Sequence, residues 1–207
     1  MTFPATRTIC EGSRLAIIAP AGPFNREAFD AGADWLRQRY EISFDESIFG
    51  KCGYFAGSDQ DRLAGLLKAI EDPDIDGILC ARGGFGTTRL LPEINIDSIA
   101  GANKTVVGFS DITALHSAWA RAGVRSIHAP MVAALGNAPT EVRNNWINAV
   151  ESTGRDLSFP LEELASGQAK GRLFGGNLAV LAALVGTPFA PPLKGTILFL
   201  EDVGERP

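Results

Sequence analysis

A serine lies where an apolar run meets a helix-like pattern, in the segment 106–116 (VVGFSDITALH). A serine at such a strand-to-helix corner can act as a nucleophile, because the helix N-terminus stabilises negative charge that develops on an attacked carbonyl. The segment resembles the nucleophile motif G-x-S-x-G but lacks its last glycine. Ser110 can equally be a helix N-cap, since serine is among the residues preferred there. On the motif alone, the cap is favoured.

A serine nucleophile needs a general base, and the sequence contains two histidines. His116 lies nearly two turns beyond Ser110 on the same expected helix, so we expect that it does not reach the hydroxyl. His128 follows the next expected strand, where it is either a base or a loop histidine bonded to the backbone. Two isolated histidines also lack the ligand spacing of a metal site, so no metal or other cofactor is expected.

Two further segments carry groups that could assist such a serine. The turn 81–86 (ARGGFG) has neither the G-x-G-x-x-G nor the GK[ST] spacing of a nucleotide-binding loop. Gly83 and Gly84 either make a tight turn or present bare backbone N–H groups to an oxyanion. The apolar run that ends in Glu201 places a carboxylate at a strand end, where it is either exposed or able to orient a histidine.

Elements that position these residues alternate along the chain. Apolar runs typical of strands occur at 14–20, 40–47, 76–82, 104–110 and 124–130. Helical patterns lie at 25–40, with Asn25 as N-cap, at 58–73, with a capping box of Ser58 and Asp61, and after Ser110. This rhythm predicts an α/β fold, a mostly parallel sheet flanked by helices of the Rossmann or flavodoxin-like kind. Ligands of such sheets bind beyond the carboxyl ends of the strands, where Ser110, the glycine turn 81–86 and His128 fall.

Composition excludes several classes of function. The net charge of −5 comes without a basic stripe, so we expect no nucleic-acid partner. The uncharged segment 173–193 is long enough to span a bilayer, but its Gly and Pro residues would break a helix, so no membrane partner is expected. The three cysteines are far apart and the N-terminus is unlike a signal peptide, which favours a reducing, cytoplasmic location.

Several motifs taken together resemble the bacterial LD-carboxypeptidases, a family of serine peptidases that includes microcin immunity proteins. The segments that carry the resemblance run in the family's order along the chain: APAGPF, GYFAGSDQDRLAGLLKAIEDPDIDGILCARGGFGTTRLLPEI, VVGFSDITALHSAW, HAPM, GRLFGGNLAVLAALVGTP and ILFLEDVGERP. Their co-occurrence is more specific than any single motif, and it reverses the preference for a cap at Ser110.

The resemblance implies a role for each candidate residue. Ser110 is the nucleophile and Glu201 the triad carboxylate, while the N–H groups of Asp111 and Gly84, with Gly83 as a further candidate, form the oxyanion hole. Arg82, Asn177 and His128 are candidates for the substrate pocket. His128 matches the family's His-Gly-Pro, here His-Ala-Pro, which is not the family's base. The family's catalytic histidine lies beyond the equivalent of Pro207, so the 207 residues alone are expected to be inactive.

The resemblance also implies an organisation and an activity. We expect an N-terminal α/β domain over 1–155, a linker over 156–170, and over 171–207 the start of a C-terminal domain that is truncated. The implied activity is metal-free hydrolysis of the bond to the terminal D-alanine of murein tetrapeptides in peptidoglycan recycling, by a cytoplasmic homodimer. Alternatives are hydrolysis of peptidyl or aminoacyl nucleotide amides, as in microcin immunity, and a non-catalytic small-molecule-binding domain.

Overall fold

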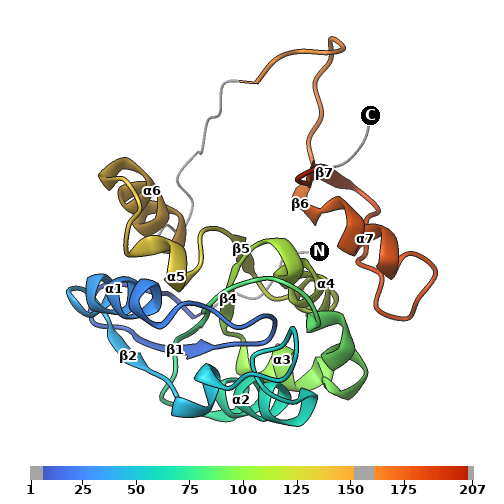
Figure 1. Cartoon of the computed structure of the whole chain (residues 1–207). Coiled ribbons are helices and arrows are strands. Elements are labelled where there is room, and N and C mark those ends of the chain that lie inside the picture. The colour runs from blue at the N-terminus through green and yellow to red at the C-terminus, as the bar shows by residue number, and fades with distance from the viewer. Residues whose placement is uncertain (1–6, 152–160, 205–207) are drawn as a thin grey trace.

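The computed structural model describes residues 7–151 and 161–204. These residues contain two β-sheets, and the strands within each sheet are parallel (Figure 1). The larger sheet has five strands: β1 (Arg14–Ile18), β2 (Glu41–Ser43), β3 (Gly77–Cys80), β4 (Thr105–Gly108) and β5 (Ser126–His128). Their order is β2-β1-β3-β4-β5 and every pair is parallel. This is the flavodoxin-like order, whose switch point lies between β1 and β3. The predicted fold class is confirmed.

Helices cover both faces of this sheet. They are α1 (Arg26–Arg37), α2 (Asp59–Glu71), α3 (Ile96–Ala102), α4 (Thr113–Ala122), α5 (Val132–Leu135) and α6 (Thr140–Glu151). One core contains buried side chains of α1, α5 and α6, and the other contains those of α2, α3 and α4. Along β3, Ile78 and Cys80 face the second core while Leu79 faces the first, as the alternation of side chains along a strand requires. The molecule is therefore layered helix, sheet, helix around the five strands (Figure 1).

Local sequence explains where the first helices begin. Asn25 caps α1 by accepting a hydrogen bond from the N–H of Ala28 at 2.9 Å. Ser58 and Asp61 form the expected capping box at the start of α2. Three 3-10 helices, Glu46–Phe49, Thr87–Glu93 and Ser110–Ile112, complete the connections. The expected strands are present but shorter than their apolar runs, because the chain turns into loops directly after each strand.

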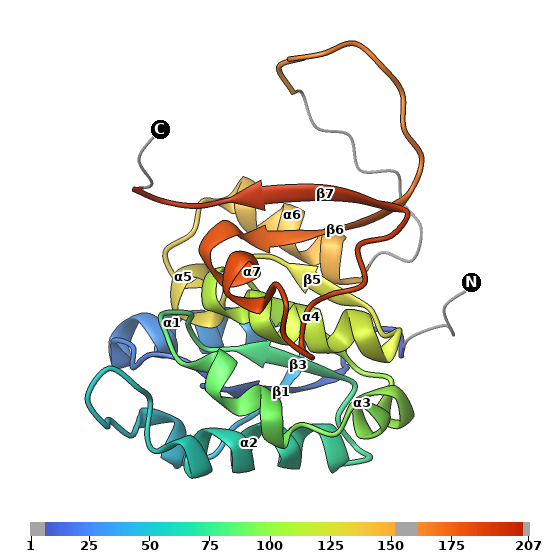
Figure 2. The ribbon, with the colours of Figure 1, turned by 90° about the vertical axis from the view of Figure 1, so that its right-hand side faces the viewer.

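The second sheet consists of β6 (Arg172–Asn177) and β7 (Thr196–Glu201), paired in parallel around α7 (Leu178–Leu184). Figure 2 shows these two strands side by side above α4. The backbone N–H of Asn177 donates to Oγ1 of Thr113 at 3.0 Å, and Oγ of Ser117 donates to the carbonyl of Phe189 at 2.5 Å. The second sheet thus docks on the helix that follows Ser110.

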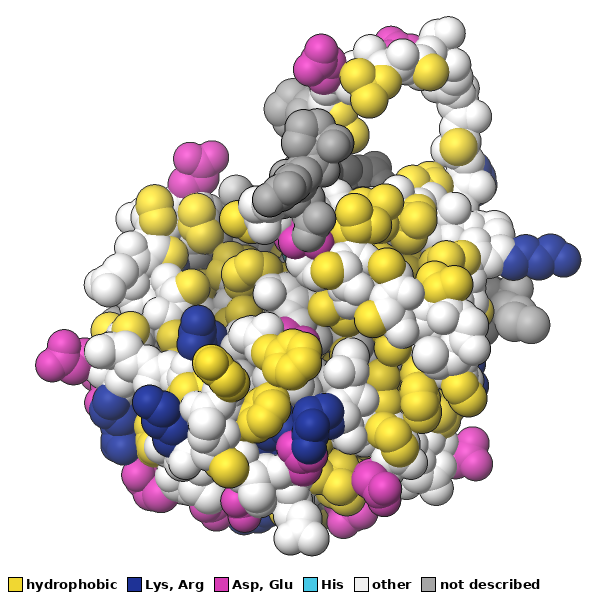
Figure 3. Space-filling view, turned by 45° about the vertical axis from the view of Figure 1, so that its right-hand side comes forward, with side chains coloured by type: hydrophobic (Ala, Val, Ile, Leu, Met, Phe, Trp, Pro, Cys, Tyr) yellow, Lys and Arg dark blue, Asp and Glu magenta, His cyan; other side chains and the backbone are white. Residues whose placement is uncertain are grey.

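Strand β7 of the second sheet has one half-buried face and one exposed face. Phe199 and Glu201 on β7 are half-buried, whereas Leu198 and Leu200 are exposed, so alternate side chains point toward and away from the first sheet. Exposed hydrophobic side chains also gather on the upper part of the face in Figure 3.

The boundaries expected within the chain are met only in part by described residues. Of the expected linker 156–170, residues 156–160 lie outside the described part, and residues 161–170 contain no helix or strand. Among the helices of the described ranges, none is long and apolar enough to cross a membrane.

Candidate active site

Ser110 stands directly after β4 in a conformation that few residues adopt. Its φ is +62°, a left-handed value that costs a non-glycine residue about 1–2 kcal/mol. Close packing tightens the corner, because a Cβ at Gly108 would lie 2.9 Å from the side chain of Ile112. Helix α4 begins at Ile112 as its N-cap, and no side chain caps either α4 or the short helix before it. The cap hypothesis for Ser110 is therefore wrong; the corner has the strain of a nucleophile elbow.

The glycine turn after β3 lies against this serine. A Cβ added at Gly83 would lie 3.2 Å from Cβ of Ser110, so a side chain at position 83 would crowd the nucleophile. The carbonyl of Gly83 accepts a hydrogen bond from the N–H of Gly22 at 3.1 Å. Because a trans peptide directs N–H opposite to C=O, the N–H of Gly84 points away from Gly22. Gly84 has φ +126°, and this favours glycine.

The side chain of Asp111 joins the serine corner to the glycine turn. It is buried, and its Oδ2 accepts a hydrogen bond from the N–H of Thr87 at 2.9 Å. The N–H groups expected to form an oxyanion hole, those of Gly84 and Asp111, belong to these two loops. Sequence reasoning assigned a role only to the N–H of Asp111. The charged side chain directly after the serine was the available signal for this second role.

A cleft opens where these loops meet. Its volume is 790 Å³, and it lies beyond the carboxyl ends of β1, β3, β4 and β5 at the switch point of the sheet. The residues that line it are Pro23, Phe24, Asn25, Ala28, Lys51, Ala81, Arg82, Gly83, Gly84, Phe109, Ser110, Met131, Ala133 and Ala134. The structure thus brings Ser110 together with the glycine turn and Arg82.

Neither histidine lines this cleft. His116 is buried on α4, where Nε2 donates to the carbonyl of Gly108 at 2.9 Å. Burial lowers the pKa of His116 to about 4. His128 packs edge-on against Phe109 and Phe199, with ring centroids 5.9 and 5.0 Å away, and burial also lowers its pKa. Both rings are thus held neutral within the packing.

Glu201 ends β7 beside Asn177 of β6. Its Oε1 is buried and has no hydrogen-bond partner among the described residues. Burial, followed by the charge of Asp202, raises the pKa of Glu201. A buried carboxylate oxygen without a donor is costly, so this atom is ready to accept a hydrogen bond from a group placed opposite it.

Asn177 and Asp202 are committed to local structure. Oδ1 of Asn177 caps α7 by accepting from Val180 at 3.1 Å, and its Nδ2 donates to Asp202 at 3.1 Å. Asp202 also accepts from the N–H of Ala179, and its backbone hydrogen bonds lower its pKa. These bonds hold the end of β7, and with it Glu201, against the start of α7.

Two basic residues near the cleft were missed by sequence reasoning. Arg62 is buried on α2, and its Nη1 donates to the carbonyls of Pro20 and Gly86, one on the loop after β1 and one on the glycine turn. Lys51 reaches the cleft from the loop between β2 and α2. Neither residue follows a strand of the sheet, so the rule that led to the other candidates contains no signal for them.

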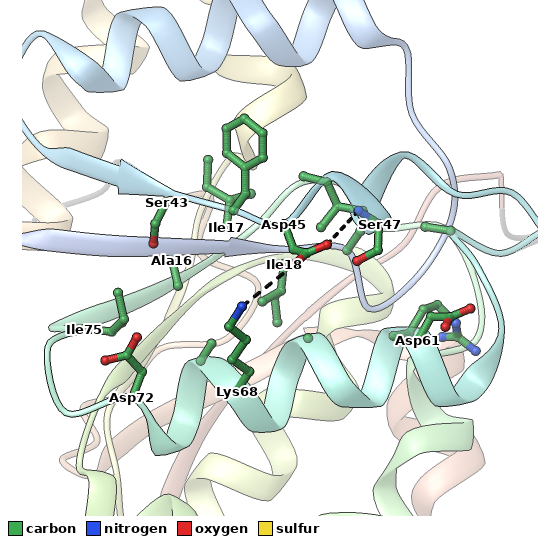
Figure 4. Close-up of a pocket in the computed structure, with 17 residues that line it drawn as sticks. Ala16, Ile17, Ile18, Ser43, Asp45, Ser47, Asp61, Lys68, Asp72 and Ile75 are labelled. Atoms are coloured by element: carbon green, nitrogen blue, oxygen red, sulfur yellow. Dashed lines mark hydrogen bonds and ion pairs between the residues drawn. The ribbon is translucent and has the colours of Figure 1, made fainter.

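A second cavity, of 230 Å³, lies between β1, the 3-10 helix 46–49 and α2 (Figure 4). It shares no lining residue with the cleft at Ser110. Lys68 reaches across it toward Asp45, with Nζ 3.8 Å from Oδ2. We therefore place the candidate active site in the cleft that contains Ser110. Over residues 7–151 and 161–204, no group of three or more His, Cys, Asp or Glu side chains is placed to hold a metal ion.

Two family profiles match this chain. The sequence profile of the LD-carboxypeptidase N-terminal domain matches residues 15–129, and that of the LD-carboxypeptidase C-terminal domain matches residues 170–207. The chain belongs to the LD-carboxypeptidase family. The resemblance seen in the sequence motifs is thereby confirmed.

Relatives within the family are longer than this chain. A protein of Streptomyces coelicolor is 39% identical over 96% of this chain and 67% of its own length. The murein tetrapeptide carboxypeptidase of Pseudomonas aeruginosa is 34% identical over 93% of this chain and 67% of its own length. Over the first relatives the matched share of their length is 65–67%, so this chain spans about two thirds of them.

Solved structures share the fold. The muramoyltetrapeptide carboxypeptidase from Oxalobacter formigenes has a TM-score of 0.85 at 29% identity, over 93% of this chain and 67% of that one. The microcin C7 self-immunity protein in complex with aspartyl sulfamoyl adenosine has a TM-score of 0.84 at 22% identity, over 96% of this chain and 71% of that one. Both kinds of LD-carboxypeptidase relative therefore have the architecture described above.

Proposed function

We propose that this protein carries the nucleophile of a serine-type LD-carboxypeptidase that removes the terminal D-alanine from murein tetrapeptides. The observation that carries the proposal is Ser110, held at φ +62° after β4 in a cleft formed with a glycine turn. Membership of the LD-carboxypeptidase family supports the reaction class, and the name of the Pseudomonas aeruginosa relative supports the substrate.

In the proposed reaction, Oγ of Ser110 attacks the carbonyl carbon of the bond to the terminal residue. The carbonyl oxygen then carries negative charge, which the N–H groups of Gly84 and Asp111 stabilise, with Gly83 as a further donor. The general base, which took the proton of the Ser110 hydroxyl during the attack, gives that proton to the amine of D-alanine as the peptide bond breaks. Water then hydrolyses the acyl ester and frees Ser110. Each oxyanion-hole donor of this kind contributes about 2.7–4 kcal/mol to such reactions.

Glu201 is proposed as the carboxylate that orients the general base. The unpartnered, buried Oε1 of Glu201 supports this role, since an orienting carboxylate must accept a hydrogen bond from a ring N–H. Phe199, two residues earlier on the same side of β7, contacts His128, and this places Glu201 on the side of β7 that faces the first sheet.

We further propose that neither histidine of this chain is the base. His116 is bonded to Gly108, and His128 is packed between aromatic rings outside the cleft. Purified residues 1–207 are therefore expected to release no measurable D-alanine from a murein tetrapeptide. Turnover that disappears in His128→Gln would contradict this expectation and assign the base to His128.

The nucleophile is tested in a chimera. Residues 1–202 would be joined to the C-terminal third of the Pseudomonas aeruginosa relative, and D-alanine release would be measured. We expect Ser110→Ala to lower kcat/KM by roughly 10⁴-fold or more, whereas Ser43→Ala, an exposed serine on β2, leaves it unchanged. Undiminished release by the Ser110→Ala chimera would remove Ser110 from the mechanism.

The main rival is hydrolysis of nucleotide amides, as the microcin-immunity relatives suggest by name. A site for adenine would be expected to offer a stacking aromatic side chain. Trp119 and Trp146 are buried, Trp35 packs on Trp146 at 5.7 Å, and none of the three lines the cleft. Phe24 and Phe109 do line it, so aromatic side chains alone do not decide between the two substrates. Turnover by the chimera of a tetrapeptide and of an aspartyl sulfamoyl adenosine, measured side by side, separates the two.

The remaining expectations stay proposals about the setting. We propose that the site acts in the cytoplasm in peptidoglycan recycling, within a homodimer, and that the chain divides into a unit over 1–155, a linker over 156–170 and a unit over 171–207. Arg82 remains a proposed pocket residue and lines the cleft, whereas Asn177 and His128, proposed with it from the resemblance, are not among the residues that line it. Sedimentation of the purified protein would test the dimer.

A further inference from the structure

The cleft at Ser110 carries positive charge on a protein that is acidic overall. Among the described residues that line it, Lys51 and Arg82 are charged and none is Asp or Glu. The whole chain has 24 acidic and 19 basic residues. The lining of the cleft is therefore positively charged, whereas the net charge of the whole chain is negative. A cleft with such a lining attracts anionic ligands.

Arg82 is held at the cleft by a contact that leaves its charge uncompensated, and Lys51 has no ion pair among the described residues either. Nη1 of Arg82 donates to the carbonyl of Pro23 at 2.5 Å, which fixes the guanidinium between the loops after β1 and β3. Within the described ranges, no carboxylate lies within ion-pair distance of Arg82 or Lys51, although ten such pairs occur elsewhere.

The loop that carries Lys51 is attached to the walls of the cleft. The N–H of Ala56 donates to the carbonyl of Ala21, on the loop after β1, at 2.9 Å. The ring of Phe55 stacks on Phe85 of the glycine turn, with centroids 6.1 Å apart and planes 25° apart. The loop that carries Lys51 is thus attached both to the loop after β1 and to the glycine turn that contains Arg82.

The second cavity provides a comparison within the same molecule. Lys68 in that cavity lies 3.8 Å from Asp45 (Figure 4). Arg62, which also lines the cavity, is paired with Asp59 at 2.5 Å. Its cations are therefore neutralised by neighbouring acids. Uncompensated positive charge distinguishes the cleft that contains the serine.

We propose that Lys51 and Arg82 bind the terminal carboxylate of the peptide and so restrict the site to the last bond of a chain. This inference rests on the function proposed above and names the feature of the substrate that the cleft selects. The attacked carbonyl and the terminal carboxylate are separated by about one residue, roughly 3.8 Å. A receptor for that carboxylate must therefore share the cleft with Ser110, as these two cations do.

The test measures binding and does not require catalysis. Chain 1–207, labelled with ¹⁵N, is titrated with a murein tetrapeptide that ends in D-alanine and with the same peptide as its C-terminal amide. We expect the acid to bind about tenfold more tightly than the amide at low ionic strength, because charged hydrogen bonds to a carboxylate are lost in the amide. The amide signals of Gly83, Gly84 and Asp111 report whether the ligand lies in the cleft.

Variants locate the receptor. Lys51→Met is expected to remove most of the difference between acid and amide, as is Arg82→Met, while Arg82→Lys keeps part of it because the charge remains without the planar fork. Lys68→Met, which removes an exposed cation from the second cavity, is the matched control and is expected to change nothing.

Each outcome decides between the two proposals. If both peptides shift the cleft signals with equal affinity, or if the difference survives in Lys51→Met and Arg82→Met, the carboxylate receptor is wrong while a peptide site remains. If neither peptide shifts the signals of Gly83, Gly84 and Asp111, the receptor and the proposed peptidase function are both overturned for this chain.

Discussion

Ser110 combines a reactive group with a strained backbone. A left-handed φ places its side chain at the tip of the corner between β4 and α4, against Gly83. The sequence indicated the corner, because an apolar run, Gly108 and a serine precede a helical pattern. The sequence did not indicate the sign of φ at Ser110, because a helix N-cap is also commonly a serine but has an extended backbone conformation.

The strain predicts that removing the Cβ stabilises the protein. Ser110→Gly is expected to raise the free energy of unfolding by about 0.5–1 kcal/mol, because glycine adopts positive φ without the cost that serine bears, offset in part by a more flexible unfolded chain. Ser110→Ala keeps the strained Cβ and serves as the control, with a change close to zero. Urea denaturation measures both, and a glycine variant less stable than the alanine variant would contradict the prediction.

The glycine turn predicts the opposite effect of adding a side chain. Gly84→Ala places a Cβ at φ +126° and 3.2 Å from the backbone of Gly22, so we expect a loss of about 1–3 kcal/mol. Gly65→Ala on α2, where a Cβ meets nothing within 4 Å, is the control and is expected to stabilise. Equal changes in the two variants would show that the turn tolerates a side chain.

At the level of elements, most of the first sheet could be predicted because buried parallel strands are continuous apolar runs. The ends could not. The run 40–47 becomes a strand of three residues, since Phe44 packs onto Phe29 and Phe49 at 5.1 and 6.0 Å instead of extending the edge. Tertiary packing of the aromatic rings ends this strand early, and the chain then enters the connection that carries Lys51. A local sequence pattern does not predict such packing.

Helix α4 contains a titratable group that resists protonation. The unfolded chain binds a proton at His116 below about pH 6.5, whereas the folded chain does so only below about pH 4. Between these values the unfolded state binds more protons, so the free energy of unfolding falls as the pH falls. We expect a loss of up to about 3 kcal/mol from this residue between pH 6.5 and pH 4.

The variant His116→Gln isolates that contribution. Glutamine can donate to the carbonyl of Gly108 but does not titrate, so its stability is expected to depend less steeply on pH in this window. Urea denaturation of both proteins at half-unit intervals measures the slopes. Identical slopes would exclude His116 as their source.

At the scale of the whole molecule, the two sheets meet at one close approach. A Cβ at Gly176 would lie 2.4 Å from Oγ1 of Thr113, and Gly176 has φ +147°. The motif GRLFGGN contributed to the family resemblance but did not predict this contact, because the partner lies on a helix 63 residues earlier in the sequence. Contacts between distant segments are the part of the candidate site that spacing alone could not predict.

Gly176→Ala is therefore expected to loosen the second sheet. We expect faster hydrogen exchange over 172–201, by an amount that corresponds to about 2–4 kcal/mol, with little change in β1, β3 and β4. Gly186→Ala is the matched control, since Gly186 also has positive φ, +77°, but a Cβ there meets nothing within 4 Å. A control that loosens the second sheet equally would assign the effect to backbone strain alone.

The distance in sequence between the serine and the carboxylate proposed to serve it has a consequence for biosynthesis. The last strand of the first sheet ends at His128, and Glu201 is made some seventy residues later. At the usual speed of translation this interval lasts roughly 4–15 s. A nascent chain thus contains every residue that lines the cleft, the last of which is Ala134, before Glu201 is added. In the proposed mechanism, the order of synthesis leaves Ser110 without its orienting carboxylate during this interval.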